Sequence, residues 1–551
     1  MMKKKFLRLN NSFWTGFAAA LAAGAVATGV MIFLSVSLGG VSLPEVFGSS
    51  LTALIPPSLF NYLHQAIGAD AKRYLFYGII VGQCLVFALS GAIYNQRLNI
   101  QNRRLQWNDG LLLALILWFL VGVIFLPLNG AGIFGADLST GFVAGLISLT
   151  VVGLVFGLLF VLFQRWIGAQ LSRQDVMKSD DSSLDRDVDS YEAISRRNLL
   201  RNGVIVAGIV LLGVGAWRFI TEGVSTSRVS VASLLQHYKS KIVPPPTPNY
   251  GEIRPVQFLS PEITLNDQFY IVSKNLTADP TVDGNSWRLT VDGQVDNPFT
   301  LTYQELLGQP MKQQYESLMC ISNEVGGQYM SNALWEGIPL MDLLQRAGVK
   351  AGATKIVFHA YDDYTDSIHL TKALEPTTLL AVRMNSTTLP QEHGFPARML
   401  VPGIYGMKHC KWVTRIEVVN YDFQGYWQQR GWSDPAPVRL TARIDTPLDG
   451  STVTANRTTY IAGVAFSGNK GISEVDVSTD SAQSWQRATL KQPLSGLTWV
   501  LWELAWQPPQ AGTYIVTARA IDLDGNVQDP TEEPPLPNGS SGYHSITLNV
   551  T

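Results

Sequence analysis

The first two-fifths of the chain alternate between long apolar runs and short polar connections. Five runs cover Phe13–Leu38, Tyr74–Tyr94, Leu111–Leu128, Phe142–Phe163 and Gly203–Trp217. The first four approach or exceed the roughly 20 apolar residues that cross the hydrocarbon core of a bilayer, and successive uncharged runs of this length are rare in soluble folds. The pattern therefore predicts an N-terminal α-helical transmembrane bundle of about five helices over residues 1–222.

A weaker stretch, from Val41 to Asp70, separates the first two runs. Its prolines and scattered polar side chains suit a segment that lies at the membrane interface, or re-enters the bilayer, better than one that spans it. We therefore expect an interfacial or re-entrant segment here.

The charges of the connections predict the orientation of the bundle. Basic residues gather before the first run, in the second connection and in the fourth, whereas the third connection, Asn129–Ser139, has none. Because basic loops stay on the cytoplasmic side, an odd number of spans places everything after residue 222 outside the cytoplasm. We expect a multi-pass protein of the cell membrane, in contact with membrane lipid, whose remaining part is extracytoplasmic.

The fifth run is preceded by the sequence Ser195-Arg196-Arg197-Asn198-Leu199-Leu200-Arg201. This order of residues resembles a twin-arginine export signal, placed inside the chain instead of at its start. The alternative is an ordinary basic flank of a membrane helix, which needs charge but no particular order. Twin-arginine export moves folded proteins, so the first interpretation implies a cofactor that is inserted before export.

The pattern changes after residue 222. Residues 223–250 include the proline-rich stretch Pro244–Pro248, a stiff extended spacer, and are predicted to be a linker. Residues 251–434 mix short strands with a helix at Met341–Ala347, closed by Gly348, which indicates an α+β domain. The strands expected there are Ser286–Val291, Lys355–Tyr361, Met399–Val401 and Trp412–Val419.

From residue 435 onward the chain reads as regularly spaced strands separated by turns. The strands expected are Thr459–Ala465, Glu474–Ser478, Trp499–Trp506 and Thr513–Ile521. This spacing predicts an all-β immunoglobulin-like sandwich over residues 435–551. The chain is thus expected to be a multidomain protein that is part membrane protein and part soluble protein.

Composition narrows the classes of function. The 551 residues include 41 basic and 43 acidic side chains, a net charge of −2, which argues against a nucleic-acid partner. Only 15% of residues are charged and the mean hydropathy is +0.12, in agreement with a chain that lies partly in lipid. Three cysteines are too few for a dense disulfide framework.

Two separated clusters suggest chemistry. Cys320 stands where a strand-like run gives way to a glycine-bearing loop, although a lone cysteine is most often packing. The second cluster runs from His393 to Trp412 and combines histidine, arginine, lysine and glycine-rich turns. Such groups suit a bound anion, particularly a phosphate. A soft thiolate beside a phosphate site fits a metal that is held by sulfur and carried on a phosphorylated organic cofactor.

From about Gly251 to Val550 the chain resembles the sulfite oxidase family of molybdopterin enzymes. The first half resembles their catalytic domain and the second half their immunoglobulin-like dimerisation domain. The matching motifs are Cys320 with Leu334-Trp335-x-Gly337-x-Pro339-Leu340, Leu379–Ala381, Met384–Asn385, the block from His393 to Trp412, Glu474–Ser478, Ser484–Trp485, Trp499–Trp502 and Ala518–Asp524. Several separated motifs in the same order make this a strong signal of the family.

The resemblance implies a molybdenum-molybdopterin cofactor and two-electron oxo transfer. It implies that Cys320 is the ligand to the metal. It further implies that the residues holding the pterin and its phosphate are Asn275, Asp362, His393, Arg398, His409, Cys410 and Lys411. For Cys410 we favour the alternative of a packed side chain that lends only its backbone to the cofactor.

The chain also departs from the family. A tyrosine of the family's active site is replaced by Trp432, which we count among the catalytic candidates, and an arginine of its substrate site by Ser273 or Lys274. Loss of a guanidinium removes bidentate recognition of an oxyanion, which puts sulfite oxidation in doubt. The catalytic subunit of protein-methionine-sulfoxide reductase offers a second likeness, although such relatives usually lack the dimerisation domain.

These observations together predict a membrane-anchored, extracytoplasmic molybdopterin-dependent oxidoreductase that acts on a small oxo compound. No histidine pair lies within the apolar runs, so electrons are expected to pass to or from a separate electron-transfer protein or a quinone. The dimerisation-type domain raises the prospect of a homodimer. The rival interpretation is a membrane-tethered binding or adhesion protein that keeps the fold without catalysis.

Overall fold

The computed structural model describes residues 11–67, 71–138, 141–180, 250–276 and 278–551. The fifth apolar run, the twin-arginine motif and nearly all of the expected linker lie outside the described residues. Contacts divide the described chain into two compact units. The first contains residues 11–54, 71–180 and 275–278, and the second contains residues 55–67, 250–274 and 279–551, in both cases as far as they are described.

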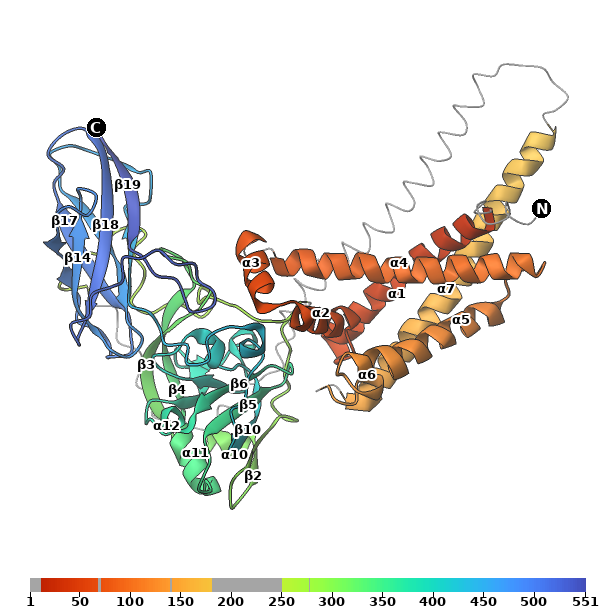
Figure 1. The fold of residues 1–551 in the computed structure, drawn as a ribbon, viewed down its shortest axis with the longest axis horizontal. Coiled ribbons are helices and arrows are strands. Elements are labelled where there is room, and N and C mark those ends of the chain that lie inside the picture. Colours follow the sequence, from red (N-terminus) through yellow and green to blue (C-terminus); the bar gives the residue numbers. More distant parts are fainter. Residues whose placement is uncertain (1–10, 68–70, 139–140, 181–249, 277) are drawn as a thin grey trace. The chain divides into compact units, whose positions relative to one another are not determined.

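The first unit is helical (Figure 1). Its elements are α1 (Asn11–Leu38), α2 (Leu43–Leu54), α4 (Ala71–Ile100), α5 (Trp107–Phe119), the π-helical stretch η2 (Leu120–Phe125), α6 (Leu126–Leu128), the short turn η3 (Ile133–Gly135) and α7 (Gly141–Asp180). Among the described residues, four helical stretches are long and apolar enough to cross a membrane: Ser12–Val36, Ala71–Ile100, Trp107–Leu128 and Gly141–Gln170. They coincide with the first four apolar runs, so the prediction of apolar helices there is confirmed.

Small residues allow the helices of this unit to pack closely. Helix α1 packs along α4 and α7, and α5 packs along α7. A Cβ atom added to Gly91 would collide with Ala20 Cβ, and one added to Gly110 would lie 2.5 Å from the Gly157 carbonyl oxygen. Glycine and alanine at such contacts are typical of helix pairs in membranes, where close backbone approach replaces the hydrophobic effect.

The second unit begins, along the chain, with α3 (Pro57–Ile67). The stretch Val41–Asp70 therefore forms two helices, α2 and α3, that belong to different compact units. The α3 side chains Leu59, Tyr62, Leu63 and Ile67 are exposed. An exposed apolar surface on a short helix agrees with the interfacial segment expected from the sequence, which stays a prediction.

Two sheets, one mixed and one antiparallel, form the α+β part of the second unit (Figure 1). The first has the order β2-β1-β10-β5-β6, with β1 parallel to β10 and the other pairs antiparallel. Its strands are β1 (Arg288–Gly293), β2 (Phe299–Thr302), β5 (Lys355–Ala360), β6 (Thr365–His369) and β10 (Val413–Val419).

The second sheet has the order β3-β4-β7-β8, and β9 pairs with β7. Its strands are β3 (Lys312–Met319), β4 (Met330–Pro339), β7 (Leu379–Met384), β8 (Thr387–Thr388) and β9 (Arg398–Leu400). The helices and helical turns of the α+β part are α10 (Tyr303–Leu307), α11 (Leu340–Ala347), α12 (Leu370–Ala373), η6 (Gln391–His393), η7 (Gly406–Lys408) and η8 (Gln428–Arg430). One apolar cluster fills the space between the two sheets.

The rest of the second unit is a sandwich of two sheets. One has the order β11-β13-β17-β16 and the other β12-β19-β18-β14-β15. The strands are β11 (Thr441–Thr446), β12 (Thr452–Val453), β13 (Thr459–Phe466), β14 (Ile472–Ser478), β15 (Gln486–Arg487), β16 (Thr489–Leu490), β17 (Val500–Trp506), β18 (Gly512–Asp522) and β19 (His544–Val550). The all-β prediction is confirmed, and each expected strand lies within two residues of an observed one.

Hydrogen bonds with the sandwich hold the end of β3 and the loop that follows it. Ser317 in β3 donates its backbone N–H to the Leu497 carbonyl at 3.0 Å and accepts a bond from the Trp499 N–H at 2.9 Å. Ser540 Oγ donates to the Asn323 carbonyl at 2.8 Å. The position of Cys320, the residue directly after β3, is thus set by both halves of the second unit.

Candidate active site

A cavity in the second unit brings together residues from five separated parts of the chain. Its lining includes the stretch 269–274, Cys320, residues 362 and 364, nine residues between Glu392 and Trp412, and the pair Trp427 and Trp432. Of the predicted site residues, Cys320, Asp362, His393, Arg398, His409, Cys410, Lys411 and Trp432 line it. Asn275 does not: it is buried and belongs to the first unit.

Cys320 is held rigidly at one wall of the cavity. Its backbone N–H donates to the Tyr329 carbonyl at 3.0 Å, and its Sγ lies 2.9 Å from Ser322 Oγ. Burial raises the pKa of the thiol above its usual value, so in this environment the neutral thiol is favoured. A bound cation would reverse that preference, because a coordinating thiol is deprotonated.

Arg398 is a buried cation whose hydrogen-bond partners are neutral. Its Nη atoms donate to the carbonyls of His393 at 3.2 Å and His409 at 3.4 Å, and its Nε has no partner among the described residues. Its guanidinium carbon lies 5.2 Å from the Trp335 ring centroid. Burial lowers the pKa of Arg398 to about 10, which leaves it charged at neutral pH. The arrangement suits an anion that enters the cavity.

The two histidines of this cluster are neutral at pH 7. Burial lowers the pKa of His393 to about 4 and that of His409 to about 3. His393 Nε2 lies 2.7 Å from the Asn266 carbonyl oxygen. In His409, Nε2 lies 3.1 Å from the Ile404 carbonyl and Nδ1 accepts the Val401 N–H at 3.4 Å. Because both ring nitrogens of His409 meet the backbone, its ring shapes the wall beside Arg398.

Two lysines add positive charge to the lining. Lys411 Nζ donates to the Glu392 carbonyl at 3.0 Å and lies 3.7 Å from Asp279 Oδ2. Lys274 Nζ lies 3.9 Å from Asp362 Oδ2, and both side chains are more than nine-tenths buried. Asp362 therefore faces a lysine from a different segment, which links the stretch before residue 275 to the loop after β5.

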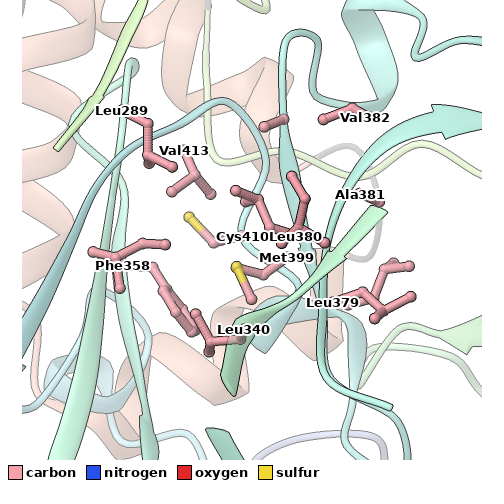
Figure 2. Close-up of a cluster of buried hydrophobic side chains, with 14 of the residues drawn as sticks. Leu289, Leu340, Phe358, Leu379, Leu380, Ala381, Val382, Met399, Cys410 and Val413 are labelled. Atoms are coloured by element: carbon pink, nitrogen blue, oxygen red, sulfur yellow. The ribbon is translucent and has the colours of Figure 1, made fainter. Parts of the chain in front are cut away.

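Cys410 packs in the apolar core. Figure 2 shows its sulfur among Leu289, Val413 and Met399. Its backbone carbonyl accepts the Met399 N–H at 2.8 Å. Burial raises the pKa of its thiol well above the usual value. These contacts support the packing alternative for its side chain.

Aromatic side chains form the wall next to Cys320. Trp432 stacks on Trp427 with ring centroids 4.0 Å apart and an angle of 8° between the planes. Trp432 belongs to the same apolar cluster as Met319 and Ile321, the residues on either side of Cys320. Trp432 thus lines the same cavity as Cys320 and shares an apolar cluster with its two neighbours.

Two glycines leave room that a side chain would fill. A Cβ atom on Gly406 would lie 2.7 Å from Tyr270 Oη and 3.8 Å from Cys320 Cα. Gly394 has a φ of +110°, and its Cβ would lie 3.0 Å from Lys411 Cβ and 3.1 Å from Arg398 Cβ. Both positions therefore keep backbone close to the groups that line the cavity.

Several lining residues were not predicted from the sequence. Tyr270, Tyr364, Met407 and Trp427 complete the wall. Tyr364 lies two residues after Asp362, and this closeness in sequence to a predicted site residue is the signal that could have identified it. Nothing in the pattern around Tyr270 distinguishes it from a core aromatic residue.

The donor set fits a metal bound through an organic cofactor. Within the described ranges, no group of three or more His, Cys, Asp or Glu side chains is arranged to hold a metal ion. A metal at Cys320 would therefore take its other ligands from a cofactor. The Arg398 Nε atom, which has no partner in the described part of the chain, and the nearby lysines fit a phosphate of such a cofactor.

Comparison with known proteins identifies the class first. The family model of the oxidoreductase molybdopterin-binding domain matches residues 276–427, and that of the Mo-co oxidoreductase dimerisation domain matches residues 437–534. The second unit thus contains a molybdopterin-binding oxidoreductase domain followed by a dimerisation-type domain.

Similarity to individual proteins identifies the family more closely. Rat (Rattus norvegicus) mitochondrial sulfite oxidase is 31% identical over 320 residues, which cover 49% of this chain and 58% of that protein. The uncharacterized oxidoreductase YuiH of Bacillus subtilis (strain 168) is 31% identical over 150 residues, 27% of this chain and 74% of that protein. The sulfane dehydrogenase SoxCD from Paracoccus pantotrophus is a structural neighbour with 22% identity and a TM-score of 0.47, covering 59% of this chain and 95% of that chain.

The chain belongs to the sulfite oxidase family of molybdopterin-dependent oxidoreductases. It spans 58% of the length of its rat relative, and the helices of its first unit precede both matched domains. This membership favours the enzyme over the binding or adhesion protein.

Proposed function

We propose that the protein is a membrane-anchored enzyme that transfers an oxygen atom to or from a small oxo compound outside the cytoplasm. The observation that carries this proposal is one cavity lined by both Cys320 and Arg398, a thiol and a buried cation whose Nε has no partner within the described ranges. When bound, the molybdenum-molybdopterin cofactor supplies the two-electron redox chemistry. Residues 251–434 would form the catalytic domain and residues 435–551 the dimerisation domain.

The side chains of the cavity have separate roles in this proposal. Cys320 would ligate the metal through its thiolate. Arg398 and Lys411 would bind the phosphate, and His393 and Asp362 would orient the pterin. His409 and Cys410 would contribute through their backbone and shape. Asn275 keeps a role only if its backbone reaches the cofactor.

The substrate proposed is a neutral molecule with an apolar substituent, such as a sulfoxide. Sulfite is a compact anion and needs fixed positive charge beside the metal. Lys274 faces Asp362, and the stacked pair Trp427 and Trp432 forms part of the wall. An indole offers one N–H donor and a broad apolar face. Loss of one charge-assisted contact costs about 1.5–3 kcal/mol, or roughly ten- to a hundredfold in affinity.

The test compares two reactions on one molybdenum-loaded preparation. We expect kcat/KM for reduction of an aryl or alkyl sulfoxide, with a reduced redox dye, to exceed kcat/KM for sulfite oxidation. A matched variant, Trp432→Tyr, should shift the ratio toward sulfite. A preference for sulfite by more than about tenfold in the unaltered protein would contradict the proposed substrate class.

The surroundings of the enzyme follow from the same proposal. Four apolar helical stretches and the charge pattern support anchoring in the cell membrane. The match to a dimerisation domain supports a homodimer. Electrons would pass to or from a separate electron-transfer protein or a quinone.

A further inference from the structure

A chain of ionisable groups begins at the wall of the cavity. Tyr364 lines the cavity, and its Oη lies 2.8 Å from Asp366 Oδ2. Asp366 Oδ1 lies 2.8 Å from Lys408 Nζ. Lys408 Nζ in turn lies 2.8 Å from Asp434 Oδ1. These three contacts lead from the cavity through β6 and η7 to the segment after Trp432.

This series of ionisable groups continues to the protein surface. Asp434 Oδ2 lies 2.7 Å from Lys355 Nζ, which lies 2.5 Å from Asp422 Oδ1. The side chains of Asp366, Lys408 and Lys355 are at most 2% exposed, that of Asp434 is 23% exposed and that of Asp422 is 73% exposed. Bulk water therefore reaches this series of groups in part at Asp434 and most freely at Asp422.

The hydroxyl of Tyr364 has two acceptors for its single proton. Tyr364 Oη lies 2.8 Å from Asp366 Oδ2 and 2.8 Å from the Met407 carbonyl oxygen. When the hydroxyl donates to Met407, the contact with Asp366 needs a proton on the carboxyl group. Burial raises the pKa of Asp366, which makes that second arrangement accessible. The two arrangements differ by the position of one proton.

A small cavity lies beside the middle of this series of ionisable groups. It has a volume of about 30 Å³, and Lys355, Ser367, Lys408 and Asp434 are among its lining residues. A cavity of about 10–15 Å³ by this measure holds one water when polar partners are present. Lys355, Lys408 and Asp434 all line this cavity, which therefore lies beside both lysine–Asp434 contacts.

We propose that Tyr364, Asp366, Lys408, Asp434, Lys355 and Asp422 form a proton relay between the candidate active site and bulk water. The inference rests on the proposed function. Oxidation of a substrate S with oxygen from water, S + H₂O → SO + 2 H⁺ + 2 e⁻, releases two protons and two electrons. The electrons go to the separate acceptor, and the protons leave through the relay; reduction reverses both flows.

Each transfer in the relay conserves protons. Tyr364 passes its proton to Asp366 and takes one from the cavity. Asp366 passes a proton toward Lys408 as Lys408 gives one to Asp434, and Lys355 repeats this exchange toward Asp422. After one passage every group has regained its starting protonation, and one proton has moved from the cavity to water.

Other charged groups face the relay and bear on any pH dependence. Asp362, Cys410 and the guanidinium of Arg430 act electrostatically on Tyr364. His369 and Lys372 line the small cavity. A pH profile of the unaltered protein therefore contains several titrations, and only variants can assign the part that belongs to the relay.

The first test uses Asp434→Asn in the full-length holoenzyme, with Glu417→Gln as the matched control. Glu417 is paired with Arg415 and is 21% exposed, close to the 23% of Asp434, but lies outside the relay. We expect Asp434→Asn to lower kcat by about tenfold or more and to enlarge the solvent deuterium isotope effect. KM and molybdenum content should stay unchanged, and added small weak acids should restore the rate. Unchanged kcat and isotope effect at equal molybdenum content would overturn the relay.

Two further variants and a second readout keep the test decisive. If Asp434→Asn does not fold, Asp422→Asn and Tyr364→Phe take its place, since the Asp422 side chain is largely exposed. In Asp422→Asn, and likewise in Tyr364→Phe, the rate should depend on the concentration of buffer. A rate that is independent of buffer concentration in both variants would overturn the proposal.

The second readout needs no turnover. In cofactor-free protein moved to D₂O, infrared difference spectra follow the exchange of the Tyr364 and Asp366 protons, assigned with Tyr364→Phe and Asp366→Asn. Exchange should be slower in Asp434→Asn than in Glu417→Gln, and equal rates would count against the relay. Absence of oxo transfer in the unaltered holoenzyme would instead contradict the proposed function and leave this readout to decide the relay.

Discussion

Two cysteines of the second unit differ in what their sulfur atoms contact. Both line the cavity, but Cys320 Sγ lies 2.9 Å from Ser322 Oγ, whereas the sulfur of Cys410 packs between apolar side chains. Both are buried, and burial raises the pKa of both thiols. The difference therefore lies in the surroundings of the sulfur atom, which faces a polar side chain in Cys320 and apolar side chains in Cys410.

The first prediction concerns this pair. Cys320→Ser should abolish turnover while much of the pterin stays bound, because the phosphate has its own contacts near Arg398 and Lys411. Cys410→Ser, the matched control, should retain molybdenum and turnover at the cost of some stability. Molybdenum analysis, pterin fluorescence and dye-linked turnover measure these outcomes. Full activity in Cys320→Ser would exclude the assigned ligand.

The second prediction concerns the buried guanidinium. Arg398→Gln should lower cofactor content, because a buried phosphate would lose a charge-assisted partner worth about 2–5 kcal/mol. In cofactor-free protein the same change should leave the thermal midpoint unchanged or raise it, because it removes a buried charge whose partners are neutral carbonyls. Arg415→Gln, at a half-exposed arginine, serves as the control. Normal pterin content in Arg398→Gln would remove this residue from the phosphate site.

The lining of the cavity could be predicted where residue type alone carries the chemistry. Cys320, His393, Arg398 and Lys411 were selected as sulfur or cationic groups in glycine-rich surroundings, and all four line the cavity. Tyr364 and Trp427 were not, because an aromatic residue in a short motif is indistinguishable from core packing. Asn275 is predicted through the resemblance to the family, and the structure groups it with the first unit.

At the scale of helices and strands, local sequence patterns predicted the elements well, whereas the long-range contacts between elements were not predicted. Helix α11 ends at Gly348 with a φ of +67°, as the glycine after a helical pattern indicates. The strands of the sandwich follow from alternation and turn spacing. The stretch Val41–Asp70 forms α2 and α3 in separate units, which depends on tertiary contacts that the local pattern does not contain.

Helix α3 contributes a side chain to the back of the tryptophan wall. The ring centroid of Phe60 lies 6.2 Å from that of Trp427, and Pro57 Cβ lies 2.5 Å from the position that a Cβ on Gly431 would take. Trp427 in turn stacks on Trp432. Helix α3 therefore supports the tryptophan pair by packing against Trp427 and does not itself line the cavity.

The third prediction follows from this contact. Phe60→Ala should raise KM for a sulfoxide with a large apolar substituent by about two- to tenfold, because an aromatic pair contributes about 0.5–1.5 kcal/mol. KM for a small substrate should change less, and molybdenum content should not change. Tyr62→Ala, at an α3 position that is 67% exposed, is the control. Equal KM changes in the two variants would show that Phe60 does not support the wall.

At the scale of the whole molecule, the fourth prediction tests the orientation in the membrane. Reporters fused after Arg173 or Asp189 should behave as cytoplasmic and those after Thr247 as extracytoplasmic. Exchanging both Arg196 and Arg197 for lysine keeps the charge and should block export if the twin-arginine interpretation holds. A cytoplasmic signal after Thr247 would contradict the topology, and normal export of the double variant would leave an ordinary basic flank.

The division of the chain into units has a practical consequence for anyone who wishes to produce the catalytic half alone. A gene that starts near residue 250 encodes both matched domains but omits residues 55–67, which the structure groups with them. In the product Trp427 would lack its contact with Phe60, so its selectivity would differ from that of the full-length protein. Supplying a synthetic peptide of residues 55–67, or grafting α3 through a designed linker, would be the natural repair. By the same reasoning, recombination between relatives would preserve selectivity only when the crossover keeps α3 and Trp427 from one parent.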